Sequence, residues 1–217
     1  MDNAWSLKKL HRTMMLSETY QSSSAFNAKA AAADAENTLL WRMNRRRLEA
    51  EAIRDTLLST AGNLKTKMFG PAVVTPVVEE EMDGVRDASQ WPVTADTTEF
   101  DRRSIYLFVK RSFRLPMMET FDTPDTTQSC ARRESSTVAP QALAMMNGAF
   151  AVSQAKRFGQ RIEKVDPAKR VDTAFQIALG RKPTEAEKAK AQGFLDKAGV
   201  DALALLLFNM SEFVYVD

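Results

Sequence analysis

The sequence predicts a mainly α-helical fold with one short β-strand or hairpin element and a long irregular loop. Apolar residues recur at helical spacing over most of the chain, and residues typical of helix starts and stops flank these stretches. One stretch alone alternates like a strand. We expect the 217 residues to form a single domain, because a chain of this length buries a core without metal or disulfide staples. The expected parts are N-terminal helices over 1–65, an irregular loop over 66–100, a strand and polar loop over 101–135, and C-terminal helices over 136–217.

The first predicted helix covers residues from about 6 to 20. Ser6 can cap it, because a serine hydroxyl accepts hydrogen bonds from free amides of the first turn. Leu7, Leu10 and Met14 then follow at spacings of three and four, which places them on one face. This pattern predicts an amphipathic helix.

The clearest helical pattern runs from about Glu36 to Ala61, and Gly62 supplies its stop. Its polar faces are rich in arginine, with acidic residues interleaved at helical spacing. Two interpretations stay open. The arginines could grip an anion, or they could form a solvated face that the acidic residues partly neutralise.

The middle of the chain loses helical periodicity. Prolines and glycines break residues 66–98 into short pieces, which predicts an irregular segment. Residues 102–112 form the one predicted strand, because Ile105, Leu107 and Val109 alternate with other bulky residues. We expect this strand to pair with a piece of the preceding loop.

The last third of the chain is predicted to be helical again. A long helix opens near residues 137–140 and continues to Ile162, although Gly148 and Gly159 weaken it. Three shorter helices should follow. The signals for them are Gly180 as the stop of a helix over about 167–179, Thr184 with Glu187 as a capping box for a helix to Gly199, and Asp201 as the cap of the last helix.

Composition excludes several classes of chemistry. One cysteine, Cys130, permits no internal disulfide or thiolate zinc cluster, and one histidine, His11, permits no multi-histidine metal site. We therefore expect neither a metal nor a cofactor. The net charge of +2 gives no global field that attracts nucleic acid. The longest apolar run, 202–208, is too short to span a membrane, and the first residues lack the apolar stretch of a signal peptide.

The segment before the long C-terminal helix is the candidate anion site. Arg132 and Arg133 precede a helix start, where free amides and the helix dipole favour negative charge. Ser136 and Thr137 add hydroxyls, and Tyr106 completes the set of candidate binding residues. A guanidinium can hold a sulfate, phosphate or carboxylate through two parallel hydrogen bonds.

A structural interpretation of the same residues competes with this one. One hydroxyl could cap the helix while Asp122, Asp125 or Glu134 pairs with the arginines. Together with Glu119, these acids are also the carboxylates available for acid–base catalysis. Glycoside hydrolysis needs two such groups facing each other, and Asp122 and Asp125 have the spacing of turn residues instead. We therefore assign no catalytic residue.

Six phrases of the sequence together resemble one protein family. In order they are WSLKKLHRTMMLSETYQ, ENTLLWRMNRRRLEAEAIRDTLL, RRSIYLFVKRS, ETFDTPDTTQSCARRESSTVAPQALAMMN, ALGRKPTEAE and EFVYVD. They resemble the planctomycete-specific C-terminal domain of unknown function, number fifteen-fifty-three, of large cytochrome-like proteins. The resemblance implies that this chain is a C-terminal fragment of that domain and that it works outside the cytoplasm.

Two functions remain open at this point. The first is a non-catalytic binding or assembly domain that docks to other domains of a larger cytochrome-like protein, with an anion site that could take an anionic glycan. The alternative is a hydrolytic or redox enzyme acting on anionic polysaccharide. Nucleic acid is not an expected partner, because acidic residues interrupt the arginine-rich face and few aromatic residues accompany it.

Overall fold

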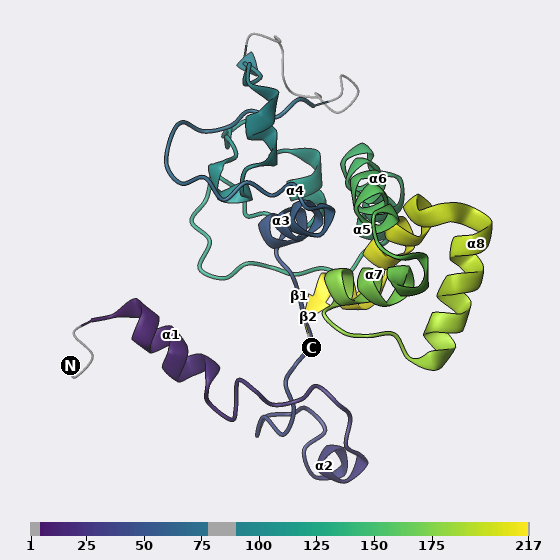
Figure 1. The fold of residues 1–217 in the computed structure, drawn as a ribbon. Coiled ribbons are helices and arrows are strands. Elements are labelled where there is room, and N and C mark those ends of the chain that lie inside the picture. Colours follow the sequence, from purple (N-terminus) through teal and green to yellow (C-terminus); the bar gives the residue numbers. More distant parts are fainter. Residues whose placement is uncertain (1–4, 78–89, 217) are drawn as a thin grey trace. The chain divides into compact units, whose positions relative to one another are not determined.

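The computed structural model describes residues 5–77 and 90–216, and these residues are mainly helical. They belong to two compact units (Figure 1). Unit 1 comprises Met1–Arg47 and Tyr215–Asp217, and unit 2 comprises Leu48–Val214. One sheet of two short strands is present in the described part of the chain. The predicted fold class, mainly α with a minor β element, is confirmed.

Unit 1 contains two short helices and the small sheet. The helices are α1 (Leu7–Met15) and α2 (Ala28–Ala33). Strand β1 (Arg46–Arg47) pairs antiparallel with β2 (Tyr215–Val216), so two segments far apart in the sequence meet there. The predicted cap of α1 is confirmed, because the Ser6 hydroxyl accepts a hydrogen bond from the Lys9 amide at 3.4 Å. The helix ends before residue 20, and the hydroxyl of Ser17 binds the carbonyl of Met14 at 2.7 Å at this end.

The predicted helix over 36–61 is wrong in its first half. Residues 36–45 are irregular, because side chains hold the backbone in turns, and Arg46–Arg47 form strand β1. Asp34 accepts the amide of Leu39 at 2.8 Å, and buried Asn37 has a positive φ of 57°. The Asn37 amide group donates to the carbonyl of Arg42 at 2.9 Å. These local bonds replace the first turns of the expected helix.

Unit 2 begins with α3 (Ala50–Ala61), which ends at Gly62 with φ of 86°, as the sequence predicted. The other helices of this unit are α4 (Pro116–Thr120), α5 (Ala139–Asn147), α6 (Ala149–Glu163), α7 (Arg170–Leu179), α8 (Glu185–Phe208) and α9 (Ser211–Val214). The larger core cluster contains buried residues from each of these helices of unit 2. Phe158 and Phe208 stack within it, with ring centroids 5.7 Å apart.

The long helix predicted up to Ile162 is two helices, α5 and α6. Gly148 separates them with extended backbone, φ −61° and ψ 130°. A Cβ at Gly148 would lie 2.4 Å from the carbonyl oxygen of Ala144, so this close turn requires glycine. Gly159 is also a packing residue, since a Cβ there would lie 2.0 Å from Oδ1 of Asp201 in α8.

The predicted stop of α7 and the predicted start of α8 are confirmed. Gly180 ends α7 with φ of 72°, and Thr184 and Glu187 form the capping box of α8. Arg181 and the Thr184 cap hydrogen bonds lower the pKa of Glu187 to about 2. Gly199 interrupts α8 with φ of 84°, at the position where the sequence predicted a stop.

The predicted strand over 102–112 is wrong. Residues 104–106 form a 3₁₀ turn, and the expected pairing with the preceding loop is reduced to one parallel bridge between Val73 and Leu107. Val73 donates its N–H to Tyr106 at 2.7 Å and accepts from Phe108 at 2.8 Å. Ile105 is 79% exposed. The alternating bulky residues of 102–112 therefore do not form a strand that is covered on both faces.

The irregular loop predicted over 66–100 is described at 66–77 and 90–100, and its remaining residues lie outside the described part of the chain. It contains short 3₁₀ turns such as Thr97–Asp101. A second, smaller cluster covers part of this region, where Trp91 packs against Phe113 with ring centroids 4.9 Å apart.

Candidate functional site

Arg133, a residue of the sequence-predicted anion site, pairs with carboxylates of the same chain. Its Nη1 lies 3.0 Å from Oε2 of Glu49 and 2.8 Å from Oε2 of Glu51. The hydrogen bond to Glu51 raises the pKa of Arg133. Both acids come from the start of α3, so the polar loop before α5 is tied to a helix more than eighty residues earlier.

Ser136 also meets an intramolecular carboxylate. Its backbone N–H donates to Asp122 at 2.8 Å and its hydroxyl donates to the same group at 2.9 Å. Buried Gln141 donates to the Ser136 oxygen at 3.0 Å and to the carbonyl of Thr120 at 3.1 Å. The N–H and hydroxyl donors expected near this helix start are present, and the carboxylate of Asp122 accepts their hydrogen bonds.

The other candidate residues have different surroundings. Arg132 is exposed, and its carbonyl accepts a hydrogen bond from Cys130 Sγ at 3.1 Å. Thr137 is exposed and has an interaction of its own. Tyr106 belongs to a separate cluster, where its hydroxyl accepts the N–H of Phe69 at 2.9 Å. Arg133, Ser136 and Tyr106 thus have three distinct sets of partners, and binding of an external anion to them stays a prediction.

The acids considered for catalysis have partners as well. Glu119 pairs with Arg114 at 2.9 Å, and Asp125 accepts the N–H and hydroxyl of Thr127. These bonds to Thr127 lower the pKa of Asp125, which favours its ionised form. Across residues 5–77 and 90–216, no group of three or more His, Cys, Asp or Glu side chains could hold a metal ion.

Two buried arginines, Arg54 and Arg102, hold backbone groups of the irregular region through hydrogen bonds. Neither is among the candidate site residues predicted from the sequence. Arg54 is 5% exposed and donates to the Arg102 carbonyl at 2.9 Å and the Ser104 hydroxyl at 3.2 Å. Its burial lowers the pKa of Arg54 to about 10. Arg102 is 1% exposed. A signal for Arg54 exists in the sequence, since it lies between Ile53 and Leu57 on the core-facing side of α3.

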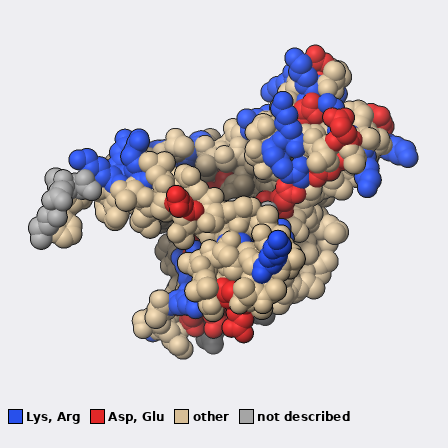
Figure 2. Space-filling view, turned by 90° about the horizontal axis from the view of Figure 1, so that it is seen from below, with Lys and Arg blue, Asp and Glu red and all other residues tan. Residues whose placement is uncertain are grey.

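A surface on α1 is the strongest candidate for binding another molecule. We define the α1 face as Trp5, Leu7, Leu10 and Met14, which are 83%, 70%, 51% and 54% exposed. None of the residues of α1 is buried. Lys8, Lys9 and Arg12 lie on the rest of the helix, and Figure 2 shows basic side chains gathered on this part of unit 1, at the left of the view.

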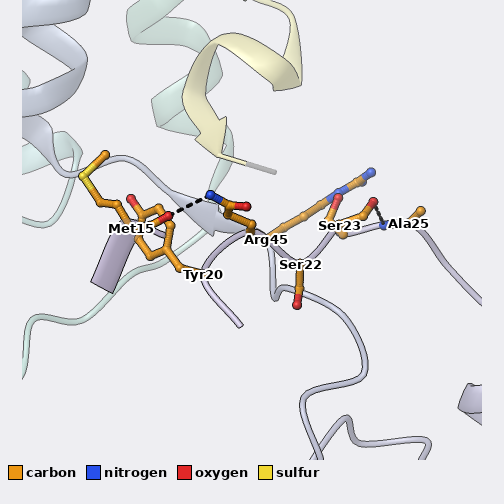
Figure 3. A pocket seen from close by; sticks show the side chains of 8 residues that line it. Met15, Tyr20, Ser22, Ser23, Ala25 and Arg45 are labelled. Atoms are coloured by element: carbon orange, nitrogen blue, oxygen red, sulfur yellow. Dashed lines mark hydrogen bonds between the residues drawn. The ribbon is translucent and has the colours of Figure 1, made fainter. Parts of the chain in front are cut away.

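A hollow of about 720 Å³ lies beside the end of α1 within unit 1. Met15 and Tyr20 line it together with Arg45 and the Ser22–Ser24 segment (Figure 3). Gln21 also lines the hollow, and its side-chain amide donates to the carbonyl of Met15 at 3.1 Å. Because Met15 and Tyr20 are 54% and 52% exposed, this hollow extends the exposed apolar surface beyond the α1 face.

No helix within the described ranges is long and apolar enough to cross a membrane. The family described as PSD1, Protein of unknown function (DUF1553), matches residues 1–195 of the chain. Comparisons with curated proteins and with solved structures found no match.

Proposed function

The chain belongs to the PSD1 family of proteins of unknown function (DUF1553), and we propose that it is a non-catalytic docking module. The observation that carries this proposal is the α1 face, whose four large apolar side chains are all at least half exposed. A contiguous exposed apolar surface with a polar rim is typical of a protein interaction site.

The energetics favour docking over permanent exposure. Burying one large apolar side chain contributes about 1.5–3 kcal/mol, so covering the α1 face stabilises the complex substantially. A helix as short as α1, nine residues, is also marginal in water without packing. A partner that covers Leu10 and Met14 would therefore stabilise the helix as well as the contact.

The charges around the α1 face indicate the chemistry of the partner. Lys8, Lys9 and Arg12 lie on the rest of α1 and make the helix basic, and no acidic residue lies in its first turn. The complementary surface is an apolar groove with acidic residues at its rim, as in other cases where an amphipathic helix lies in a groove. We propose that this groove belongs to another domain of the larger cytochrome-like protein implied by the resemblance, outside the cytoplasm.

A photo-crosslinking experiment tests this proposal. A photoreactive amino acid replaces Leu10 in one variant and Thr13, on the polar side of α1, in a matched control. Both are produced in cells that make the natural protein. We expect the Leu10 variant to form one defined crosslink to a protein segment that is apolar and flanked by Asp or Glu, and the Thr13 variant to form it much less.

A second pair of variants separates docking from general stickiness. Leu10→Asp removes apolar contact and should abolish recovery of the same partner, whereas Lys9→Glu reverses one charge of the basic helix and should weaken recovery. Equal crosslinking from Leu10 and Thr13, crosslinks to many unrelated proteins, or recovery that survives Leu10→Asp would each contradict the proposal.

A further inference from the structure

A loop of unit 2 holds one aromatic side chain in solvent. Phe69 is 78% exposed, and its φ of 62° is unusual for a residue with a bulky side chain. The Phe69 N–H donates to the hydroxyl of Tyr106 at 2.9 Å, and Arg102 donates to the Phe69 carbonyl. Both backbone polar groups of Phe69 are thus fixed from within the protein, while the ring points away from the core.

A buried arginine holds the base of this loop. Arg102 is 1% exposed, and its guanidinium carbon lies 3.9 Å from the centre of the Tyr106 ring. Its Nη1 also donates to the carbonyl of Pro71 at 3.2 Å and pairs with Glu99 at 3.3 Å. Residues held in sparsely populated backbone conformations cluster at functional sites, where surrounding contacts maintain the strain.

Arg103 lies beside this loop, and no anionic partner for it is found among residues 5–77 and 90–216. Its guanidinium is 5.7 Å from the Tyr106 ring and contacts the Met68 sulfur, and its Nε is shielded from solvent without a hydrogen-bond acceptor. No carboxylate among the described residues forms an ion pair with it. The neighbouring acids have other partners: Glu99 pairs with Lys67 and Arg102, Asp101 with Arg157, and Asp55 with Ser104 and Arg54.

We propose that Arg103 and Phe69 form a binding site for a peptide segment that carries a carboxylate next to a large apolar side chain. The carboxylate pairs with the Arg103 guanidinium, and the apolar side chain lies against the Phe69 ring. Met68 and Ile105, which are 54% and 79% exposed, extend the apolar part. This composition favours a peptide over a sugar, because sugar hydroxyls require several polar side chains in the same place. The site is independent of the α1 face.

The test uses the full chain with its methionine methyl groups labelled for NMR, and the Met68 signal is assigned by its loss in Met68→Leu. The probes are N-acetyl-phenylalanine, which has a carboxylate and an aromatic ring, and its neutral amide, which lacks the charge. We expect the acid to shift the Met68 signal saturably and the amide to bind at least about tenfold more weakly, as expected when a charge-assisted hydrogen bond is lost.

Substitutions test whether Arg103 and Phe69 form the binding site. Arg103→Gln and Phe69→Gly should each weaken the binding of N-acetyl-phenylalanine by about tenfold or more, whereas Arg111→Gln, a matched change of an exposed arginine, should leave it unchanged. Absence of a saturable shift, equal binding of acid and amide, or an effect of Arg111→Gln equal to that of Arg103→Gln would overturn the proposal. Tighter binding of glucuronate than of N-acetyl-phenylalanine would also overturn it and identify a sugar site instead.

Discussion

Phe69 shows how a single residue stores backbone strain. Its φ of 62° lies in the left-handed region, which costs a residue with a Cβ about 1–2 kcal/mol. Glycine adopts this conformation without that cost, although it loses more entropy on folding. The ring contributes little burial in return, since it is 78% exposed. Strain at this position therefore has no compensating core contact.

The strained backbone of Phe69 leads to a prediction about the stability of two variants. Phe69→Gly and Phe69→Ala both remove the ring, but only the glycine variant relieves the strain. We expect the glycine variant to have a free energy of unfolding about 1 kcal/mol higher than that of the alanine variant. Urea denaturation of both variants measures the difference. A less stable glycine variant would show that the left-handed backbone at residue 69 is not strained.

Ion pairs between distant parts of the chain explain why the sequence alone left the partners of Arg133 and Ser136 open. Arginine and serine side chains are suited to binding an anion, and in the structure carboxylates of the same chain bind Arg133 and Ser136. Two of these partners, Glu49 and Glu51, are more than eighty positions away in the sequence. Local sequence patterns contain no information about such pairing, because it depends on how the helices pack.

Elements with strong local signals were predictable, and elements set by long-range contacts were not. The capping box of α8 and the glycine stops of α3 and α7 act within one helical turn, so the sequence alone indicated them. The strand expected over 102–112 failed, because buried Arg102 binds carbonyls of a distant loop and a 3₁₀ turn follows it. Tertiary contacts override local propensity in that segment.

Helices α6 and α8 provide a prediction at the scale of elements. A Cβ at Gly159 would lie 2.0 Å from Oδ1 and 3.2 Å from the backbone Cα of Asp201, so the Asp201 side chain would have to move and the backbone of α8 to shift by a few tenths of an ångström. We expect Gly159→Ala to lower the free energy of unfolding by about 1–3 kcal/mol. Gly193 in α8 is a matched control, since a Cβ there meets nothing within 4 Å.

Gly193→Ala should raise the free energy of unfolding by up to about 1 kcal/mol, because alanine is the better helix former. Thermal or urea unfolding of the two variants measures both effects. Equal effects of the two substitutions would mean that the close approach of α6 and α8 at Gly159 does not limit packing.

At the scale of the whole molecule, the buried apolar residues are unevenly distributed. Within the described ranges they all lie between Ala50 and Phe213, inside unit 2, and the one buried residue of unit 1 is the polar Asn37. Since apolar burial is the main favourable contribution to folding, unit 2 should hold nearly all of the stability.

A shortened chain tests this distribution. We expect residues 48–214 alone to unfold cooperatively in urea, with a midpoint and a denaturant m-value close to those of the full chain, because m follows the surface exposed on unfolding. Circular dichroism at increasing urea concentration measures both quantities. Loss of cooperativity in the shortened chain would show that unit 1 takes part in forming the core.

The bond between Asp122 and Ser136 has a consequence for competition. A carboxylate tethered to the same chain is present at an effective concentration of roughly millimolar or more, and it never diffuses away. Two hydrogen bonds, at 2.8 and 2.9 Å, hold it in place. A free anion at micromolar concentration would have to displace this tethered rival, so only a ligand that also makes contacts outside the Asp122 position could occupy the start of α5.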